Sequence, residues 1–301
     1  MKQDEIKKTI VNNVSEYAGS DAGEVAGGLI SAAIGGPEGA AAGSIATTAI
    51  EHMFQNMGSE IKKRTLAPLE EQRVGTVYTK AKELIEEKIA QGEVPRNDTF
   101  FDRGSNSRPA SEELLEGTLL AAQREHEDKK TVYLARLHAN ILFHPEISRP
   151  SANHLIKIAE QLTYRQIVIL SVTGFMCQAR SMTPSINFFK KGAYRSVSGV
   201  ENVTIAAEIF EMYHMSLLGS SEAILDSAGI NPNALSLIGY GAHLYKLMDL
   251  GSLEPDPELL KMQGQIMTFL ADPIPCQRKF GITPSNLQAI QTACATATIS
   301  R

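Results

Sequence analysis

The residue pair best suited to acid–base chemistry is Arg149 and His154, which stand five positions apart. An imidazole exchanges protons near neutral pH and a guanidinium holds anions, so such a pair could serve general acid–base chemistry. Pro150 and Ser151, between them, are typical of the start of a helix. We therefore expect His154 inside a helix and Arg149 outside it, which disfavours a catalytic pair.

Histidines and carboxylates in the middle of the chain are candidate metal ligands. They are Glu125, His126, Asp128, His138 and His144. No HExxH pattern is present and only His138 shares a helix face with its neighbours, so we expect surface or core histidines, with no metal and no cofactor. The cysteines, at 177, 276 and 294, are too few and too far apart for a zinc knuckle or a disulfide framework.

Two other segments could contact phosphates. Residues 239–241 read GYG, but they lack the Lys-Ser/Thr that completes a phosphate-binding loop. Residues 188–195, FFKKGAYR, interleave aromatic and basic side chains that could touch phosphates or anionic lipid headgroups, although a solvated loop is the simpler interpretation. Since no serine nucleophile elbow is present either, we expect a protein that is not an enzyme.

A repeat of small residues marks the N-terminal part. Its members, one at every fourth position, are Gly19, Gly23, Gly27, Ser31, Gly35, Gly39, Gly43 and Thr47. Helical neighbours lie three and four positions apart, so this spacing predicts a helix face on which a second backbone can approach closely. Such a glycine zipper packs helices inside bilayers, where small residues replace the missing hydrophobic drive.

Residues typical of helix ends and helix starts in this segment predict a helical hairpin. We expect helices over about 21–34 and 37–56, joined at a turn of Gly36, Pro37 and Glu38 and stopped by Gly58. The residues expected to face lipid are Leu29, Ile30, Ile34, Ile45 and Ile50. Together with Val25 they contribute roughly 3 kcal/mol to insertion, about the cost of one central carboxylate, so insertion is marginal and suits a form that inserts only on oligomerisation.

Composition favours an ordinary protein with a hydrophobic core. The chain has 301 residues, of which 43% are apolar and 21% charged, with a net charge of −5. No general field for nucleic acid follows, and from Ser151 onward basic and acidic side chains are equal in number. The charged start carries no secretory signal, so we expect an intracellular, reduced chain.

Helical periodicity continues beyond the hairpin and predicts a mainly α fold with three domains. After the hairpin of residues 1–58, we expect a helical region at 59–149 and a helical, winged-helix-like domain with a small β-wing at 150–301.

The middle region should hold an amphipathic surface helix over 66–89, an exposed loop at 91–110 and a long helix over 111–143. In the first helix we expect Leu69, Val77, Leu84 and Ile85 to be buried. Three helices, begun by Ser151, by Thr163 and near Ala206, should precede the wing, and a final helix should span 257–270.

Two known families share patterns with this chain. Its Gly-rich start, LAPLEEQRVGTVYTKAKELIEEKI, RPASEELLEGTLLAAQREHEDKKTVYLARLHANIL and HLIKIAEQLTYRQIVIL resemble the abortive-infection alpha family of bacterial proteins, mainly over residues 66–170. That resemblance implies a role in anti-phage defence, in which the infected cell is killed or arrested. The spacing of Arg149 and His154 resembles the Arg-x4-His motif of HEPN ribonucleases, which usually have a polar residue where Pro150 stands.

These observations predict a membrane-active effector of abortive infection that oligomerises through the hairpin and permeabilises the inner membrane. The expected partners are other copies of the chain, membrane lipid on activation and a phage or host protein as trigger, with no nucleic acid. We expect the protein to be cytoplasmic at rest and at the inner membrane when active. The alternatives are a soluble helical adaptor or assembly protein with the hairpin buried and, third, a HEPN-like ribonuclease.

Overall fold

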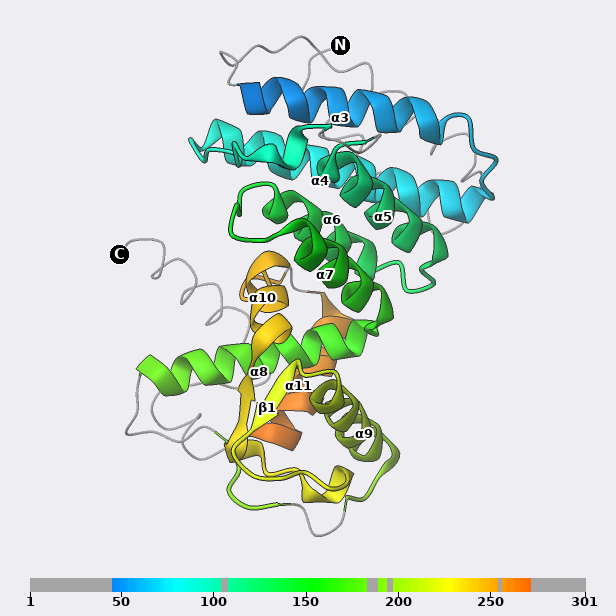
Figure 1. Cartoon of the computed structure of the whole chain (residues 1–301). Helices are drawn as coiled ribbons and strands as arrows, with labels where there is room; N and C mark the ends of the chain where they lie inside the picture. Colours follow the sequence, from blue (N-terminus) through cyan, green and yellow to red (C-terminus); the bar gives the residue numbers. More distant parts are fainter. Residues whose placement is uncertain (1–44, 104–107, 183–188, 194–196, 254–255, 272–301) are drawn as a thin grey trace. The chain divides into compact units, whose positions relative to one another are not determined.

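The computed structural model describes residues 45–103, 108–182, 189–193, 197–253 and 256–271, which form two compact units (Figure 1). Unit 1 extends to Glu160 and unit 2 begins at Gln161. Both are mainly helical, and unit 2 also holds a small antiparallel sheet, so the expected fold class is confirmed. The expected domain boundaries at 58/59 and 149/150 do not coincide with the boundary between these units.

Unit 1 is a stack of helices with α4 at its centre. Its elements are α3 (Ile45–Ile61), α4 (Pro68–Ala90), the 3-10 turn η1 (Thr99–Phe101), α5 (Ala110–Arg124), α6 (Lys130–Ile141) and α7 (Arg149–Gln161). Helix α4 packs on both α5 and α6, and Val77, Tyr78 and Ala81 are fully buried there. Its buried residues lie mainly on one face, as expected for an amphipathic helix; the expected burial of Val77 and Ile85 is confirmed, whereas Leu84 is half-buried and Leu69 is exposed.

Helix α3 represents the C-terminal part of the second predicted hairpin helix. It continues through Gly58 to Ile61, so the expected stop at Gly58 is wrong. Gly58 lies on the buried side of α3 beside Met57, where a residue without a side chain is tolerated inside a packed helix. The start of that predicted helix, residues 37–44, lies outside the described residues.

The single helix expected over 111–143 is two helices, α5 and α6, because residues 125–129 form a turn. The Glu125 carboxylate accepts hydrogen bonds from the backbone amides of His126 and Glu127, both at 2.9 Å. It also pairs with the Lys130 ammonium, and both side chains are buried. The middle of the expected long helix is thus a turn organised by a buried ion pair.

The segment expected to be an exposed loop at 91–110 is partly built into unit 1. Arg96 is 4% exposed, and its guanidinium donates to the Asp98 carboxylate at 2.5 and 2.8 Å and to the Ile147 carbonyl at 3.0 Å. The same guanidinium lies 3.9 Å from the ring centre of Phe100, which is also buried. This arginine fixes the loop because a buried guanidinium needs several acceptors.

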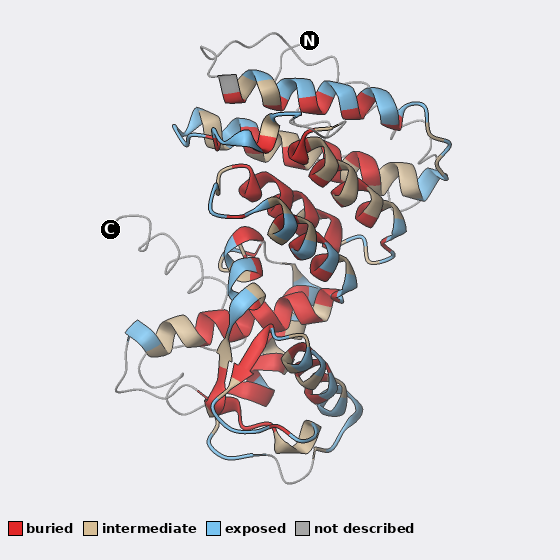
Figure 2. Cartoon of the chain, in the orientation of Figure 1, coloured by how far each residue is buried: buried red, intermediate tan, exposed pale blue. Residues whose placement is uncertain are grey.

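Unit 2 is arranged around α8. Its elements are α8 (Tyr164–Met182), α9 (Val200–His214), β1 (Leu218–Ser220), η2 (Ser227–Gly229), η3 (Pro232–Ala234), β2 (Leu235–Leu237), α10 (Gly239–Leu247) and α11 (Pro257–Leu270). Figure 2 shows α8 buried along most of its length, and it packs on α9, α10, α11 and β2. Strands β1 and β2 pair antiparallel with Gly219 opposite Ser236, which confirms the small sheet.

The three-helix grouping expected before the wing is not found within one unit. The first of those helices, α7, belongs to unit 1 except for its last residue, whereas α8 and α9 belong to unit 2. Unit 2 instead completes its core with α10 and α11. The final helix spans Pro257–Leu270 as predicted, with the Asp256 carboxylate accepting from the amides of Glu258 and Leu259.

Candidate functional site

Most of the small-residue repeat lies outside the described residues. The predicted zipper, lipid-facing and turn residues there are Gly19, Gly23, Gly27, Leu29, Ile30, Ser31, Ile34, Gly35, Gly36, Pro37, Glu38, Gly39 and Gly43. Of the remaining three, Ile45 is the first residue of α3, Thr47 is half-buried and Ile50 is 5% exposed. In this structure Ile50 therefore contacts the interior of unit 1, and lipid contact by its side chain stays a prediction for another state.

The buried face of α3, here called the α3 seat, consists of large apolar side chains. They are Ile50, Met53, Phe54, Met57 and Ile61, each no more than 5% exposed. Their spacing of three and four residues places them on one face, while Glu51, His52 and Gln55 on the opposite face are exposed. Packing here is thus achieved by large side chains rather than by close approach of glycines.

Phe54, in the α3 seat, contacts side chains of two other helices. Its ring meets the Tyr78 ring of α4 edge-on at 5.2 Å and the His138 imidazole of α6 edge-on at 6.4 Å, measured between ring centres. The Tyr78 hydroxyl also donates to the Phe54 carbonyl at 2.6 Å. Burial raises the pKa of Tyr78, so this hydroxyl remains a donor throughout the neutral range.

Polar side chains beside the α3 seat form hydrogen bonds and ion pairs with α5. Asn56 donates to the Glu112 carboxylate at 2.9 Å, and Arg64, just after α3, donates to Glu116 at 2.5 Å. Arg108 pairs with the other oxygen of Glu116. Burial alone would raise the pKa of Glu116, but its hydrogen bonds to the two arginines outweigh burial and hold that pKa below its usual range.

The residues considered as candidate metal ligands are largely dispersed. Asp128 pairs with Arg73 and His144 with Glu146, whereas His138 is buried in the core. Within the described part of the chain, the ligand atoms of Glu125, His126 and Glu127 do lie within 4.8 Å of one another. The Glu125 carboxylate is already engaged by Lys130, so this cluster offers no free set of three ligands.

The Glu125–Lys130 ion pair is buried, with 3% of each side chain exposed. Burial would raise the pKa of Glu125, yet hydrogen bonds from Lys130 and two backbone amides hold it below its usual range. The ammonium of Lys130 also donates to the carbonyl of Glu160 on α7, at 3.1 Å. The pair therefore connects the turn between α5 and α6 to the last turn of α7.

Arg149 and His154 both lie on α7, so the expectation that Arg149 would fall outside the helix is wrong. Ser148, not Ser151, receives the amide hydrogen bond at the helix start, from the Ser151 amide at 3.3 Å. At about 100° per residue, five positions separate the two side chains by about 140° around the axis. Arg149 binds the Glu113 carboxylate and His154 is exposed, so this helix does not assemble an acid–base pair.

A polar hollow of about 530 Å³ lies beside the start of α7. Arg96, Asp98, Arg103 and Arg149 line it together with the carboxylates of Asp102 and Glu146. The bond to Arg96 lowers the pKa of Asp98, so Arg96 is already neutralised. Basic and acidic lining groups balance, which gives no preference for an anionic ligand.

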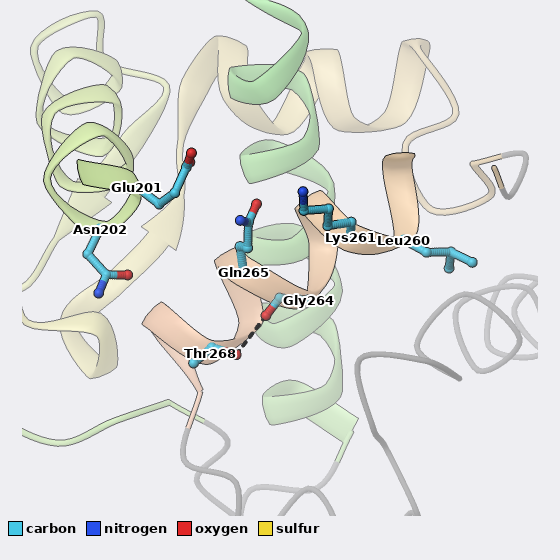
Figure 3. Close-up of a pocket in the computed structure, with 7 residues that line it drawn as sticks. All are labelled: Glu201, Asn202, Leu260, Lys261, Gly264, Gln265 and Thr268. Atoms are coloured by element: carbon cyan, nitrogen blue, oxygen red, sulfur yellow. Dashed lines mark hydrogen bonds between the residues drawn. The ribbon is translucent and has the colours of Figure 1, made fainter. Parts of the chain in front are cut away.

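Unit 2 has a second hollow, a groove of about 540 Å³ between α9 and α11 (Figure 3). Two of its polar side chains are engaged by other groups of unit 2. Glu201 pairs with Arg165 at 3.3 Å, and the Thr268 hydroxyl donates to the Gly264 carbonyl at 2.8 Å. Lys261 and Gln265 complete the polar lining, and this arrangement resembles an open surface groove more than a cofactor site.

The two segments considered for phosphate contact have structural roles. Gly241 lies where a Cβ atom would stand 2.0 Å from the Leu217 carbonyl oxygen, so this glycine permits close packing of α10. In the described part of FFKKGAYR, Phe189 is 1% exposed and the Lys190 ammonium donates to the Thr268 carbonyl. These two residues therefore anchor the segment within unit 2 and do not form a solvated loop.

Sequence reasoning missed two features, the Glu125–Lys130 pair and the isolation of His138. Spacing alone gave a weak signal for the first, since an acid and a base five positions apart do not share a face of a continuous helix. For the second, every residue of α6 is half-buried or buried, so periodicity could not single out His138.

In the described ranges, none of the helices combines the length and the apolar composition that a membrane crossing requires. No family model matches the chain, and neither a curated protein nor a solved structure matches it.

Proposed function

We propose that this chain is a membrane-active effector of bacterial anti-phage defence, held at rest by the α3 seat and assembled through the small-residue repeat after α3 is released. The observation that carries the proposal is the burial of Ile50, Met53 and Phe54 directly downstream of that repeat. The last residue of the repeat, Thr47, thus belongs to a helix whose apolar face is buried inside unit 1.

The size of the α3 seat supports the role of a restraint. Burial of a large apolar side chain contributes about 1.5–3 kcal/mol, so its five side chains contribute roughly 8–15 kcal/mol. Spontaneous release is then rare, and a trigger must bind the released state better than the seated one. A phage or host protein that binds the apolar face of α3 after its release would meet this requirement.

The composition of α3 suits both states. In the seated state its polar face, with Glu51, His52 and Gln55, contacts solvent. On release the apolar face needs new cover, which lipid or other copies of the chain can provide. The expected product is an oligomer in the inner membrane that dissipates the proton gradient.

A second function, a soluble oligomeric adaptor, is favoured by one observation. Large side chains pack α3 into unit 1, and such packing is typical of a permanent element of a soluble core. In that case α3 stays in its seat in the active protein, and the small-residue repeat packs against other copies in water.

The decisive experiment combines Gly27→Leu with Gly39→Leu in the full chain. Leucine at both positions removes the bare face, so we expect loss of toxicity and of membrane depolarisation, while thermal unfolding of units 1 and 2 stays unchanged. Gly117→Leu on α5, where no described atom lies within 4 Å of an added Cβ, is the matched control and should remain toxic.

Two outcomes would contradict the membrane proposal. Continued depolarisation by the double variant would show that the repeat does not form the pore. Recovery of the active wild-type chain only in the soluble fraction of infected cells, with liposomes left intact, would favour the adaptor.

A further inference from the structure

His138 is a titratable side chain placed where a charge cannot be stabilised. It is fully buried on α6, and within the described residues neither ring nitrogen has a hydrogen-bond partner. Burial alone lowers the pKa of His138, to about 3. The imidazole is therefore neutral in the seated structure at every pH at which the cell lives.

The cover of this imidazole includes α3. The Phe54 ring lies edge-on to it, with the two ring centres 6.4 Å apart and the planes at 86°. Phe54 is held there by its contact with the Tyr78 ring and by the hydrogen bond from the Tyr78 hydroxyl to its carbonyl. Departure of α3 removes this ring from His138.

Protonation of His138 depends on whether water reaches its ring, because its neighbours Phe54 and Tyr78 are uncharged. Helix α3 presents the apolar Phe54, and α4 presents Tyr78, which is neutral because burial raises its pKa. Among the described residues, no carboxylate or cation of α3, α4 or α5 contributes to the lowered pKa of His138. His52 on α3 and His154 on α7 are exposed in the seated state.

We propose that release of α3 from unit 1 is coupled to uptake of one proton by His138, so that α3 is released more readily as the pH falls below neutrality. In the released state the imidazole contacts water and regains an ordinary pKa of about 6.5. Above pH 6.5 it is neutral in both states and has no effect on the equilibrium. Below pH 6.5 only the released state binds the proton, so acid favours release.

The size of this effect follows from the two pKa values. With a pKa of about 6.5 when released and about 3 when seated, the opening constant of α3 rises about tenfold between pH 7.5 and pH 5.5. This inference concerns the α3 seat alone and does not rest on the proposed membrane activity. In a cell whose membrane leaks protons, the same coupling would favour release of further copies.

Amide hydrogen exchange in the full chain tests the coupling. The opening constant of residues 45–61, obtained after correction for the intrinsic exchange rates, should rise about tenfold from pH 7.5 to pH 5.5 in the wild type. In His138→Gln the rise should disappear, whatever the absolute stability of that variant. His52→Gln removes an exposed histidine from α3 itself and should keep the tenfold rise.

Either of two results overturns the proposal: a wild-type opening constant that does not change with pH, or a tenfold rise that persists in His138→Gln. If His138→Gln does not fold, NMR of the wild-type imidazoles decides. The His138 signal should stay unchanged between pH 7.5 and pH 5.5. Titration of His138 near pH 6.5 with α3 still protected would overturn the proposal.

Discussion

Truncation of Phe54 to alanine tests the α3 seat directly. Removing a buried phenylalanine side chain costs about 3–5 kcal/mol, which is roughly a third of the apolar stabilisation worked out above for the seat. Since about 1.4 kcal/mol corresponds to a factor of ten, the opening constant of α3 should rise roughly a hundredfold to a few thousandfold. The Tyr78 and His138 rings lose their shared neighbour at the same time.

The effect should remain local, because α4, α5 and α6 pack on one another without Phe54. Hydrogen exchange should therefore accelerate strongly in α3 and little in α6. If release of α3 is the activating step, the membranes of cells that express Phe54→Ala should depolarise without a trigger. Gln55→Ala changes the neighbouring residue on the exposed face of α3, and it should alter neither exchange nor toxicity.

Two results would refute this reasoning at different points. Unchanged exchange of α3 in Phe54→Ala would mean that the seat is not held by its apolar face. Faster exchange together with lower membrane leakage would mean that release of α3 inactivates the protein instead of activating it.

Two stability predictions follow from other parts of the fold. Glu125→Gln leaves the Lys130 ammonium buried without its counter-charge, so urea denaturation should show a loss of about 3–5 kcal/mol in the free energy of unfolding. Gly241→Ala places a methyl group against the Leu217 carbonyl and should cost about 1–3 kcal/mol, measured by thermal unfolding, whereas Gly117→Ala, with open space among the described atoms, should gain about 1 kcal/mol.

The helix starts that the sequence predicted correctly depend on local chemistry. Thr163 begins α8 as expected, and its hydroxyl and amide exchange hydrogen bonds with Gln166, at 3.1 and 2.9 Å. Asp256 precedes Pro257 at the start of α11 in the same way. A capping residue and its amide partner lie within three residues of each other, so sequence alone carries this information.

The missed features depend on partners far apart in the sequence. The break between α5 and α6 is stabilised where Lys130 meets the carbonyl of Glu160, thirty residues later. Likewise, α3 continues past Gly58 because Met57 and Ile61 find cover on other helices of unit 1. Tertiary contacts of this kind override the local preference of glycine for a helix end.

The candidate site was predictable only in part for the same reason. The repeat that ends at Thr47 is visible in the sequence, whereas the seat that follows is defined by what covers Ile50 and Phe54. His138 carried no sequence signal, because its significance depends on the lack of a partner for its ring nitrogens among the described residues.

The apolar face of α3 and the small-residue repeat before it differ in how their packing depends on the solvent. Large side chains such as Met53 and Met57 hold α3 on unit 1 through the hydrophobic effect, which exists only against water. A bare face like that predicted from Gly19 to Gly43 gains from backbone contact, which persists in lipid. A bilayer that touches α3 would therefore weaken the seat and would leave contacts through the predicted zipper intact. For this reason membrane contact itself would lower the cost of release, and a trigger would need to supply only the remainder.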